Sequence, residues 1–235
     1  MRRGPARGRR AQRDTPLPSL AANTSTATLP VSGSEEPFTD LTYGTPRGRG
    51  NNNCYAYAID SYRNAGASKL QPGNLSLRNG AAMNLSSCDA ITTRAMADLK
   101  NRGYAAPPES ACKKGYYKVM AFLAPGNDYH WYRQHKDALV RLTTEVPTVA
   151  ALARSMGVPS SRIYAPSARP RVGDVVLVKD AKLWSHKQGH ATGPLLKDAC
   201  GKAIRDPRVA CKKYTEELNY TQFCGAMCVK NRHRV

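Results

Sequence analysis

A cysteine placed where a helix should begin constrains the fold of this chain more than any other feature. The asparagine run 51–53 directly precedes Cys54, and asparagine is a strong helix N-cap. Four apolar residues then recur at helical spacing and form one stripe: Tyr55, Ala58, Ile59 and Tyr62. We therefore expect Cys54 in the first turn of a helix that packs on a core.

The position of Cys54 has a chemical consequence. Unpaired backbone N–H groups and the positive end of the helix dipole favour a thiolate over a thiol, and the thiolate is the nucleophile. A cysteine hydrolase presents its sulfur in this way. The same segment is also typical of a small buried residue that happens to start a helix, because free cysteine is among the most buried residue types. Both interpretations remain open from this segment alone.

A nucleophilic cysteine needs a base, and one histidine is predicted to lie on a rigid strand. Residues 116–123 read as a strand, 124–128 as a turn and 129–134 as the returning strand of a hairpin. Strand alternation places one set of side chains on one face, namely His130, Tyr132 and Gln134, and the other set on the opposite face. The chain has only four other histidines, which are His135, His186, His190 and His233.

A second histidine follows a further strand pattern. Residues 171–178 read as a strand and lead to 183–187, where His186 stands two residues after Trp184. A cysteine–histidine pair generally needs a third polar group that fixes the imidazole tautomer, and His186 or a neighbouring Asn or Asp could serve. Taken singly, each histidine is equally typical of an ordinary half-exposed strand residue.

Several strings of the sequence together resemble a little-characterised group of proteins: NNNCYAYAID, QPG, KVMAFLAPGNDYHWYRQ, LWSHKQG, IRDPRVA and NYTQFCGAMCV. In its order of cysteine, histidine and polar group, this group is similar to the NlpC-type branch of papain-like cysteine hydrolases. The resemblance spans roughly residues 51–229. It implies an α+β papain-like domain whose cysteine-bearing helix packs on an antiparallel sheet. It also implies Cys54 as nucleophile, His130 as base and His186 as the orienting group.

One departure from the group concerns the chain between the two histidine strands. A long inserted segment near 138–170 stands where the relatives have a short hairpin, and residues 147–156 read as a helix that Gly157 stops. The insertion either lies outside the sheet or shows that the assumed strand pairing is wrong. A rival base exists, since Gly189 and His190 are loosely similar to the Gly-His of amidase domains of the cysteine–histidine type.

The charge distribution predicts a basic tail on a basic domain. Residues 1–50 hold eight arginines and four acidic residues, a balance of +4 that leaves +15 of the net +19 on residues 51–235. Residues 1–50 lack the apolar area that offsets chain entropy, so we expect a disordered tail before the domain. Such a tail favours a polyanion partner, whether RNA, DNA or an acidic polymer. No secretory signal or membrane span is recognisable, and an organelle transit peptide remains an alternative.

The cysteine count fits one free thiol and three pairs, since the chain has seven. Without a secretory signal, however, reduced cysteines are the leading expectation, and the spacing of Cys200 and Cys211 suits zinc poorly. We find no phosphate-binding loop or dinucleotide fingerprint, and expect neither cofactor nor metal.

Two functions follow from these patterns. The first is hydrolysis or transfer of an acyl group at an amide or ester bond through a thioester. Peptidoglycan peptides, proteins and lipid esters all remain open as substrates. The second is a non-enzymatic nucleic-acid-binding or virion structural protein with an arginine-rich arm, in which Cys54 only fills space.

Overall fold

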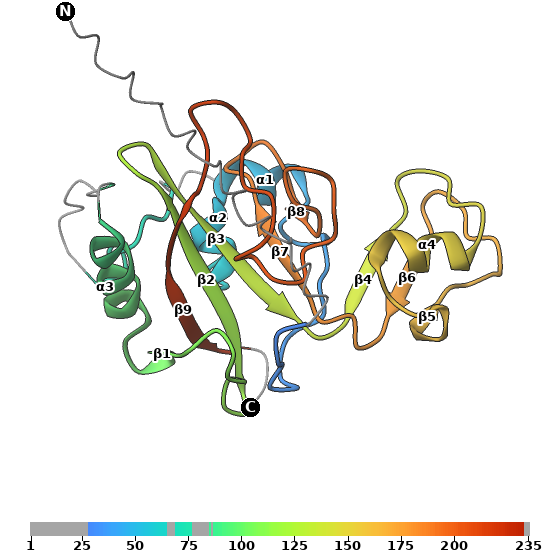
Figure 1. The fold of residues 1–235 in the computed structure, drawn as a ribbon, viewed down its shortest axis with the longest axis horizontal. Coiled ribbons are helices and arrows are strands. Elements are labelled where there is room, and N and C mark those ends of the chain that lie inside the picture. Colours follow the sequence, from blue (N-terminus) through green and yellow to red (C-terminus); the bar gives the residue numbers. More distant parts are fainter. Residues whose placement is uncertain (1–27, 65–68, 77–84, 86, 233–235) are drawn as a thin grey trace, which may run out of the picture.

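The chain folds around a six-stranded sheet in which every neighbouring pair of strands is antiparallel (Figure 1). The computed structural model describes residues 28–64, 69–76, 85 and 87–232. Within these ranges the sheet has the order β1 (Gly103–Ala105), β9 (Gln222–Lys230), β2 (Tyr116–Ala124), β3 (Asp128–His135), β7 (Leu183–Lys187) and β8 (Pro194–Leu195). The α+β class with an antiparallel sheet is thus confirmed.

The hairpin predicted from the sequence forms the centre of this sheet. β2 and β3 pair in register, with Phe122 opposite His130, and Gly126 adopts the positive φ of 76° that the turn requires. Hydrophobic alternation explains the two faces, because successive strand side chains point to opposite sides. His130 and Tyr132 therefore share one face, while Trp131 points to the other.

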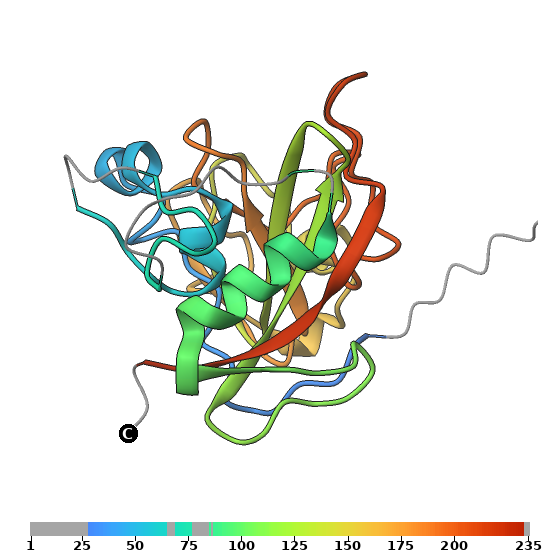
Figure 2. The same cartoon turned by 90° about the vertical axis from the view of Figure 1, so that its left-hand side faces the viewer.

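Two helices cover the first face of the sheet. They are α2 (Cys54–Ala58) and α3 (Cys88–Leu99), which continues into a short 3-10 turn, η1 (Lys100–Arg102). Figure 2 shows α3 lying across the strands beside β9. Their buried side chains, including Tyr55 and Ile91, form one core cluster with Val119 of β2 and Trp131 of β3. The sheet thus holds the cysteine-bearing helix against β3.

The second face of the sheet is covered by a segment that forms no long helix or strand. Its core cluster contains Phe122, Tyr132 and Trp184 from the strands, packed against Ile204 and Tyr220 from the segment before β9. This segment, residues 196–221, lies over the end of the sheet where His130 points.

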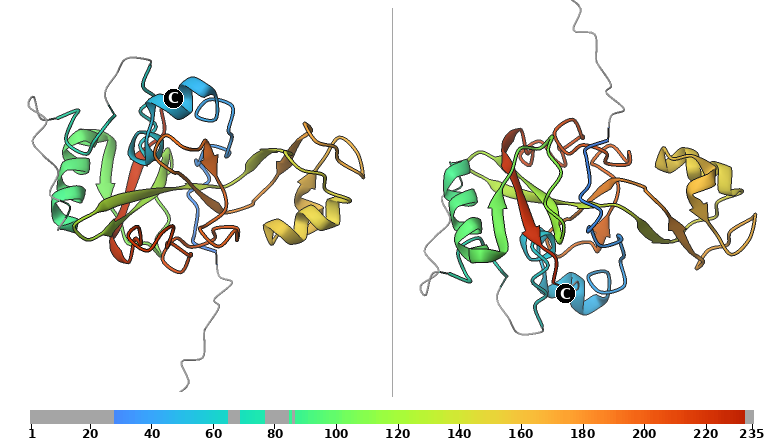
Figure 3. Two further views of the ribbon diagram at one scale, coloured as in Figure 1. Left: turned by 90° about the horizontal axis from the view of Figure 1, so that it is seen from above. Right: turned by 90° about the horizontal axis from the view of Figure 1, so that it is seen from below.

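The inserted segment forms a small module of its own that projects from the main sheet (Figure 3). Its elements are β4 (Ala138–Arg141), α4 (Val149–Met156), η2 (Ser160–Arg162), β5 (Ile163–Tyr164) and β6 (Val175–Val178), and the strands pair in the order β4, β6, β5. The Thr148 side chain caps α4, and Gly157 ends it at a φ of 61°, as expected. The insertion leaves β3 paired with β7, so the assumed strand pairing is confirmed.

The N-terminal limit of the folded chain differs from the expected residue 51. Leu29, Phe38 and Tyr43 are buried, and α1 (Pro46–Asn51) begins at a Thr45 cap. The expectation that residues 1–50 are a disordered tail is therefore wrong for 28–50, because a few apolar side chains dock on the domain core. Residues 1–27 lie outside the described residues.

The cysteines also differ from the expectation of reduced thiols. The structure contains three disulfides, Cys88–Cys224, Cys112–Cys228 and Cys200–Cys211, and leaves Cys54 free. The pairing agrees with the cysteine count, which fits one free thiol and three pairs, and not with the expectation of reduced cysteines.

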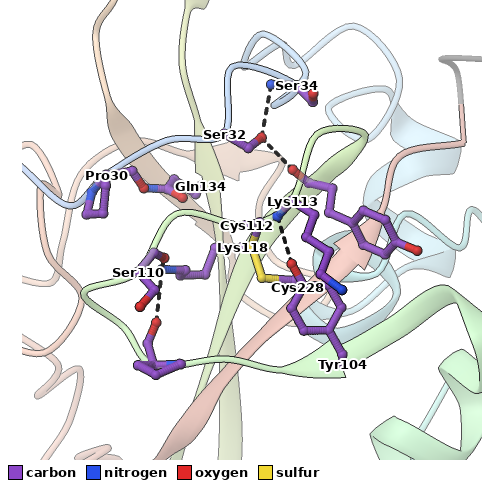
Figure 4. Close-up of a disulfide and its surroundings, with 12 residues drawn as sticks. Pro30, Ser32, Ser34, Tyr104, Ser110, Cys112, Lys113, Lys118, Gln134 and Cys228 are labelled. Carbon is purple, nitrogen blue, oxygen red and sulfur yellow. Dashed lines mark hydrogen bonds between the residues drawn. A yellow bond between two sulfur atoms is a disulfide. The ribbon is translucent and has the colours of Figure 1, made fainter.

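One of these disulfides stands beside a buried lysine. Cys112–Cys228 fastens the loop before β2 to β9 (Figure 4). The Lys118 ammonium binds the same loop through the carbonyls of Pro107, Pro108 and Ser110.

None of the helices in the described part of the chain has the length and apolar character that a bilayer crossing requires.

Candidate active site

A cavity of about 390 Å³ opens where β3 begins and α2 starts. Cys54 and His130 both line it, together with Gln71, His190 and Tyr220. Of the three residues predicted for catalysis, two therefore face this space, and the third, His186, contacts His130 from β7.

Cys54 occupies the first position of α2, as the sequence predicted. The Asn53 side chain caps the helix by accepting the Ala56 N–H at 3.0 Å. The helix ends at Ala58, before Tyr62, because Asp60 turns the chain with a φ of 53°. The expected longer stripe is therefore cut short, although all five helical residues are buried.

The Cys54 thiol is not a preformed thiolate. Burial raises the pKa of Cys54 to about 12, with Asp128 adding to the shift, while the Trp131 and Tyr55 amides and the Lys187 ammonium oppose it. The Sγ–H group donates to the Tyr129 carbonyl oxygen at 3.8 Å. The expectation of a thiolate at the helix start is wrong, because desolvation outweighs the backbone amides of so short a helix.

The two histidines form a direct hydrogen bond whose tautomers are fixed. His186 Nε2 lies 2.9 Å from the Lys197 carbonyl, which can only accept, so Nε2 carries the hydrogen. His186 Nδ1 is then the acceptor for His130 Nε2–H at 2.8 Å. A neutral His130 therefore has its hydrogen on Nε2 and a lone pair on Nδ1. The structure thus places His186 in direct hydrogen-bond contact with His130.

Burial keeps both imidazoles neutral at pH 7. Desolvation holds the pKa of His130 well below its ordinary value, and His186 adds to the shift. Desolvation also lowers the pKa of His186 to about 4, against the opposing effects of the Lys197 carbonyl and Asp198. Tyr220 stacks on the His130 ring at 4.9 Å between centroids and excludes water from it.

Cys54 and His130 lie on different sides of β3, the strand to which His130 belongs. Cys54 packs with Tyr129 and Trp131 on the helix-covered face, whereas His130 points to the opposite face. β7 pairs with β3 only from Tyr132 onward, so the edge of β3 beside residues 129–131 is open, and Sγ lies against it. Among the described residues, no hydrogen bond joins Cys54 to His130.

A glutamine that the sequence analysis did not select borders Cys54. Gln71 Oε1 accepts the Tyr129 hydroxyl at 2.5 Å, and Asn53 Nδ2 donates to the neighbouring Leu70 carbonyl. The buried Asp98 carboxylate fixes the same loop by accepting the N–H groups of three loop residues, Gly73, Leu75 and Ser76. The QPG string was a signal for this loop, but its partner Asp98 is distant in sequence.

Lys187 is a second residue of the site that the sequence patterns did not indicate. Its side chain is fully buried, and its ammonium donates to the carbonyls of Arg49 and Asn52, immediately before the Asn53 cap, and of Gly189. Burial lowers the pKa of Lys187 to about 8. It therefore holds the turn that carries Cys54 and places a positive charge near the sulfur.

The other histidines fall in different surroundings. His190, the rival base, is exposed at the rim of the same cavity. His135 is buried at the opposite end of β3, against Ser185, and His233 lies outside the described residues. No group of three His, Cys, Asp or Glu residues in the described ranges could hold a metal ion.

Comparisons with known proteins add no further constraint. No protein-family model, no curated protein and no solved structure matches this chain.

Proposed function

We propose that this protein is a papain-like cysteine hydrolase or acyltransferase that forms a thioester on Cys54 from an amide or ester. The observation that supports it most is the hydrogen-bond chain from the Lys197 carbonyl through His186 to His130. That chain leaves a lone pair on a histidine that lines the cavity with Cys54. An oriented, neutral imidazole is the base that a thiol requires. The NlpC-like relationship is part of this proposal, supported by α2 packing on an antiparallel sheet.

The mechanism begins from neutral groups. The thiol proton leaves the Tyr129 carbonyl and passes to Nδ1 of His130 while Sγ attacks the substrate carbonyl carbon. His130 then returns the proton to the leaving amine or alcohol. Water hydrolyses the thioester with His130 again as base, or an acceptor amine or alcohol takes the acyl group. Because the thiol pKa is about 12 and the imidazole is neutral, proton transfer accompanies the attack.

Two neighbouring groups would stabilise the charge that develops. The Tyr129 hydroxyl donates to Gln71 Oε1 and fixes the amide, and its N–H₂ group, on the wall of the cavity, is the donor for the substrate oxyanion. The Lys187 ammonium, which binds the turn before α2, lowers the pKa of the Cys54 thiol. Neither role requires a cofactor.

An activated ester tests the proposal without knowledge of the natural substrate. p-Nitrophenyl acetate should acetylate Cys54, which peptide mapping identifies. His130→Ala should slow this step by about 100-fold or more. His186→Gln, which keeps a hydrogen-bonding group, should retain more activity than His186→Ala. His190→Ala is the matched control, since this exposed residue lines the same cavity.

Two outcomes would contradict these assignments. If His190→Ala abolishes acetylation and His130→Ala does not, the base is His190. If Cys54 is never acetylated, and its alkylation by iodoacetamide is the same in wild type and His130→Ala, the cysteine is structural.

The alternative is a non-enzymatic polyanion-binding protein. One observation favours it: the Cys54 thiol is bonded to the strand backbone and has a raised pKa, as a packing cysteine would. The net charge of +19 supplies the attraction for RNA or DNA. In that case Cys54→Ser should leave nucleic-acid binding unchanged and no substitution at His130 should alter it.

A further inference from the structure

A second cavity lies at the other end of β3 and shares no lining residue with the first. Its volume is about 410 Å³, within the range of small-molecule sites. Three tyrosines form its aromatic wall, with Tyr43 packed edge-on against Tyr57 at 5.1 Å and against Tyr62 at 5.3 Å between ring centroids. Such a wall offers an apolar surface for the body of a ligand.

A buried arginine lines this cavity and leaves one of its hydrogen-bond donors without a partner. Arg133 is 4% exposed, and its Nε is buried without a partner. Its Nη1 donates to the Tyr57 carbonyl at 3.4 Å and forms an ion pair with Asp60 at 3.4 Å, and the guanidinium lies over the Tyr117 ring at 4.3 Å. A buried guanidinium normally satisfies its five donors, so the unpaired Nε favours a further acceptor, for which an anionic oxygen is best suited.

The surrounding charges are mainly positive. Burial raises the pKa of the Tyr117 hydroxyl and Asp60 adds to the shift, whereas Arg133, Arg102 and Arg232 all oppose it. Arg102 also has a buried Nη2 without a partner. The acidic side chains that line the cavity are Asp60, already paired with Arg133, and the half-exposed Glu36. Positive groups therefore outnumber the half-buried Asp60 carboxylate at this end of the sheet.

We propose that this cavity binds a small molecule that carries a phosphate or carboxylate group. Its anionic oxygens contact Arg133 and Arg232, and its body packs against Tyr43 and Tyr62. Arginine suits this task because its planar fork matches both anions. The site is independent of the chemistry proposed for Cys54.

Calorimetric titration of the full chain tests this site with three probes at constant ionic strength: inorganic phosphate, phenyl phosphate and benzoate. At least one should bind saturably, and the order of affinities separates phosphate from carboxylate recognition. Arg232→Ala should weaken binding about tenfold, and this exposed residue can change without loss of the fold. Arg133→Gln should abolish binding. Cys54→Ser should bind like the wild type, so the result does not depend on the proposed catalysis.

The matched control is Arg171→Ala, which removes the same charge from an exposed position in the projecting module. Its affinity should stay within twofold of the wild type. An equal loss in Arg171→Ala would show general surface attraction and overturn the proposal. Absence of saturable binding of all three probes up to about 10 mM would also overturn it. If Arg133→Gln fails to fold, the affinity of Arg232→Ala for the three probes still tests the proposal.

Discussion

Acidification should destabilise this protein strongly, because its buried histidines are neutral in the folded state. Desolvation lowers the pKa of His186 to about 4 and that of His135 to about 3, from 6.5. Above pH 6.5 neither the folded nor the unfolded chain protonates them, so they contribute nothing. Below pH 6.5 the unfolded chain binds protons that the folded chain excludes, and stability is lost as pH falls through that window.

The size of the effect follows from these values. Each histidine should remove about 1.4 kcal/mol of stability per pH unit below 6.5, down to its folded pKa. At pH 5 the loss is about 2 kcal/mol for each, or about 4 kcal/mol for His135 and His186 together. His130 shifts in the same direction. Since small domains are stable by only about 5–15 kcal/mol, the fold should be marginal near pH 5.

Urea unfolding at pH 7.5 and pH 5.0 measures this loss directly. His135→Gln should shrink the difference between the two free energies of unfolding by about 2 kcal/mol, whatever it does to stability at pH 7.5. His190→Gln is the control, because His190 is exposed. A wild-type difference below about 1 kcal/mol would refute the reasoning, since the native histidines would then accept protons. The neutral base proposed for Cys54 would fail with it.

Three further predictions concern the fold. Thiol titration of the denatured chain should find one thiol without reductant, that of Cys54, and seven after reduction. Asp98→Ala should lower the free energy of unfolding by about 3 kcal/mol, because it leaves buried loop N–H groups unpaired, and urea denaturation checks this. Deletion of residues 1–27 should weaken RNA or DNA binding and flatten its salt dependence without changing the melting temperature. Deletion of residues 1–50 should also lower the melting temperature, because it removes buried side chains such as that of Phe38.

Local patterns predicted the elements that carry the candidate site. The hairpin, the strand around His186 and the helix start at Cys54 all depend on neighbours in sequence, namely alternation, turn residues and an asparagine cap. These features need no knowledge of what covers the sheet. The place of His186 beside His130 came from the resemblance and not from the strand patterns alone.

The predictions that were wrong or missing concern side chains whose properties depend on the residues that pack against them. The helix start predicts a thiolate at Cys54, but the burial that raises its pKa comes from β3 and the chain around it. Alternation put His130 on one face, yet nothing local showed that Cys54 packs with Trp131 on the other.

The inserted module can be large because of where it is attached. His135 pairs with Leu183 at one end of the β3–β7 ladder, and the module leaves and returns at that end. His130 and His186 are placed by the register of Tyr132 with His186 at the other end of the same ladder. Because paired strands hold their register through the ladder and not through the connection, the insertion does not disturb the histidine pair. β3 thus separates two sites: the candidate active site where the strand begins, and the arginine-lined cavity where it ends.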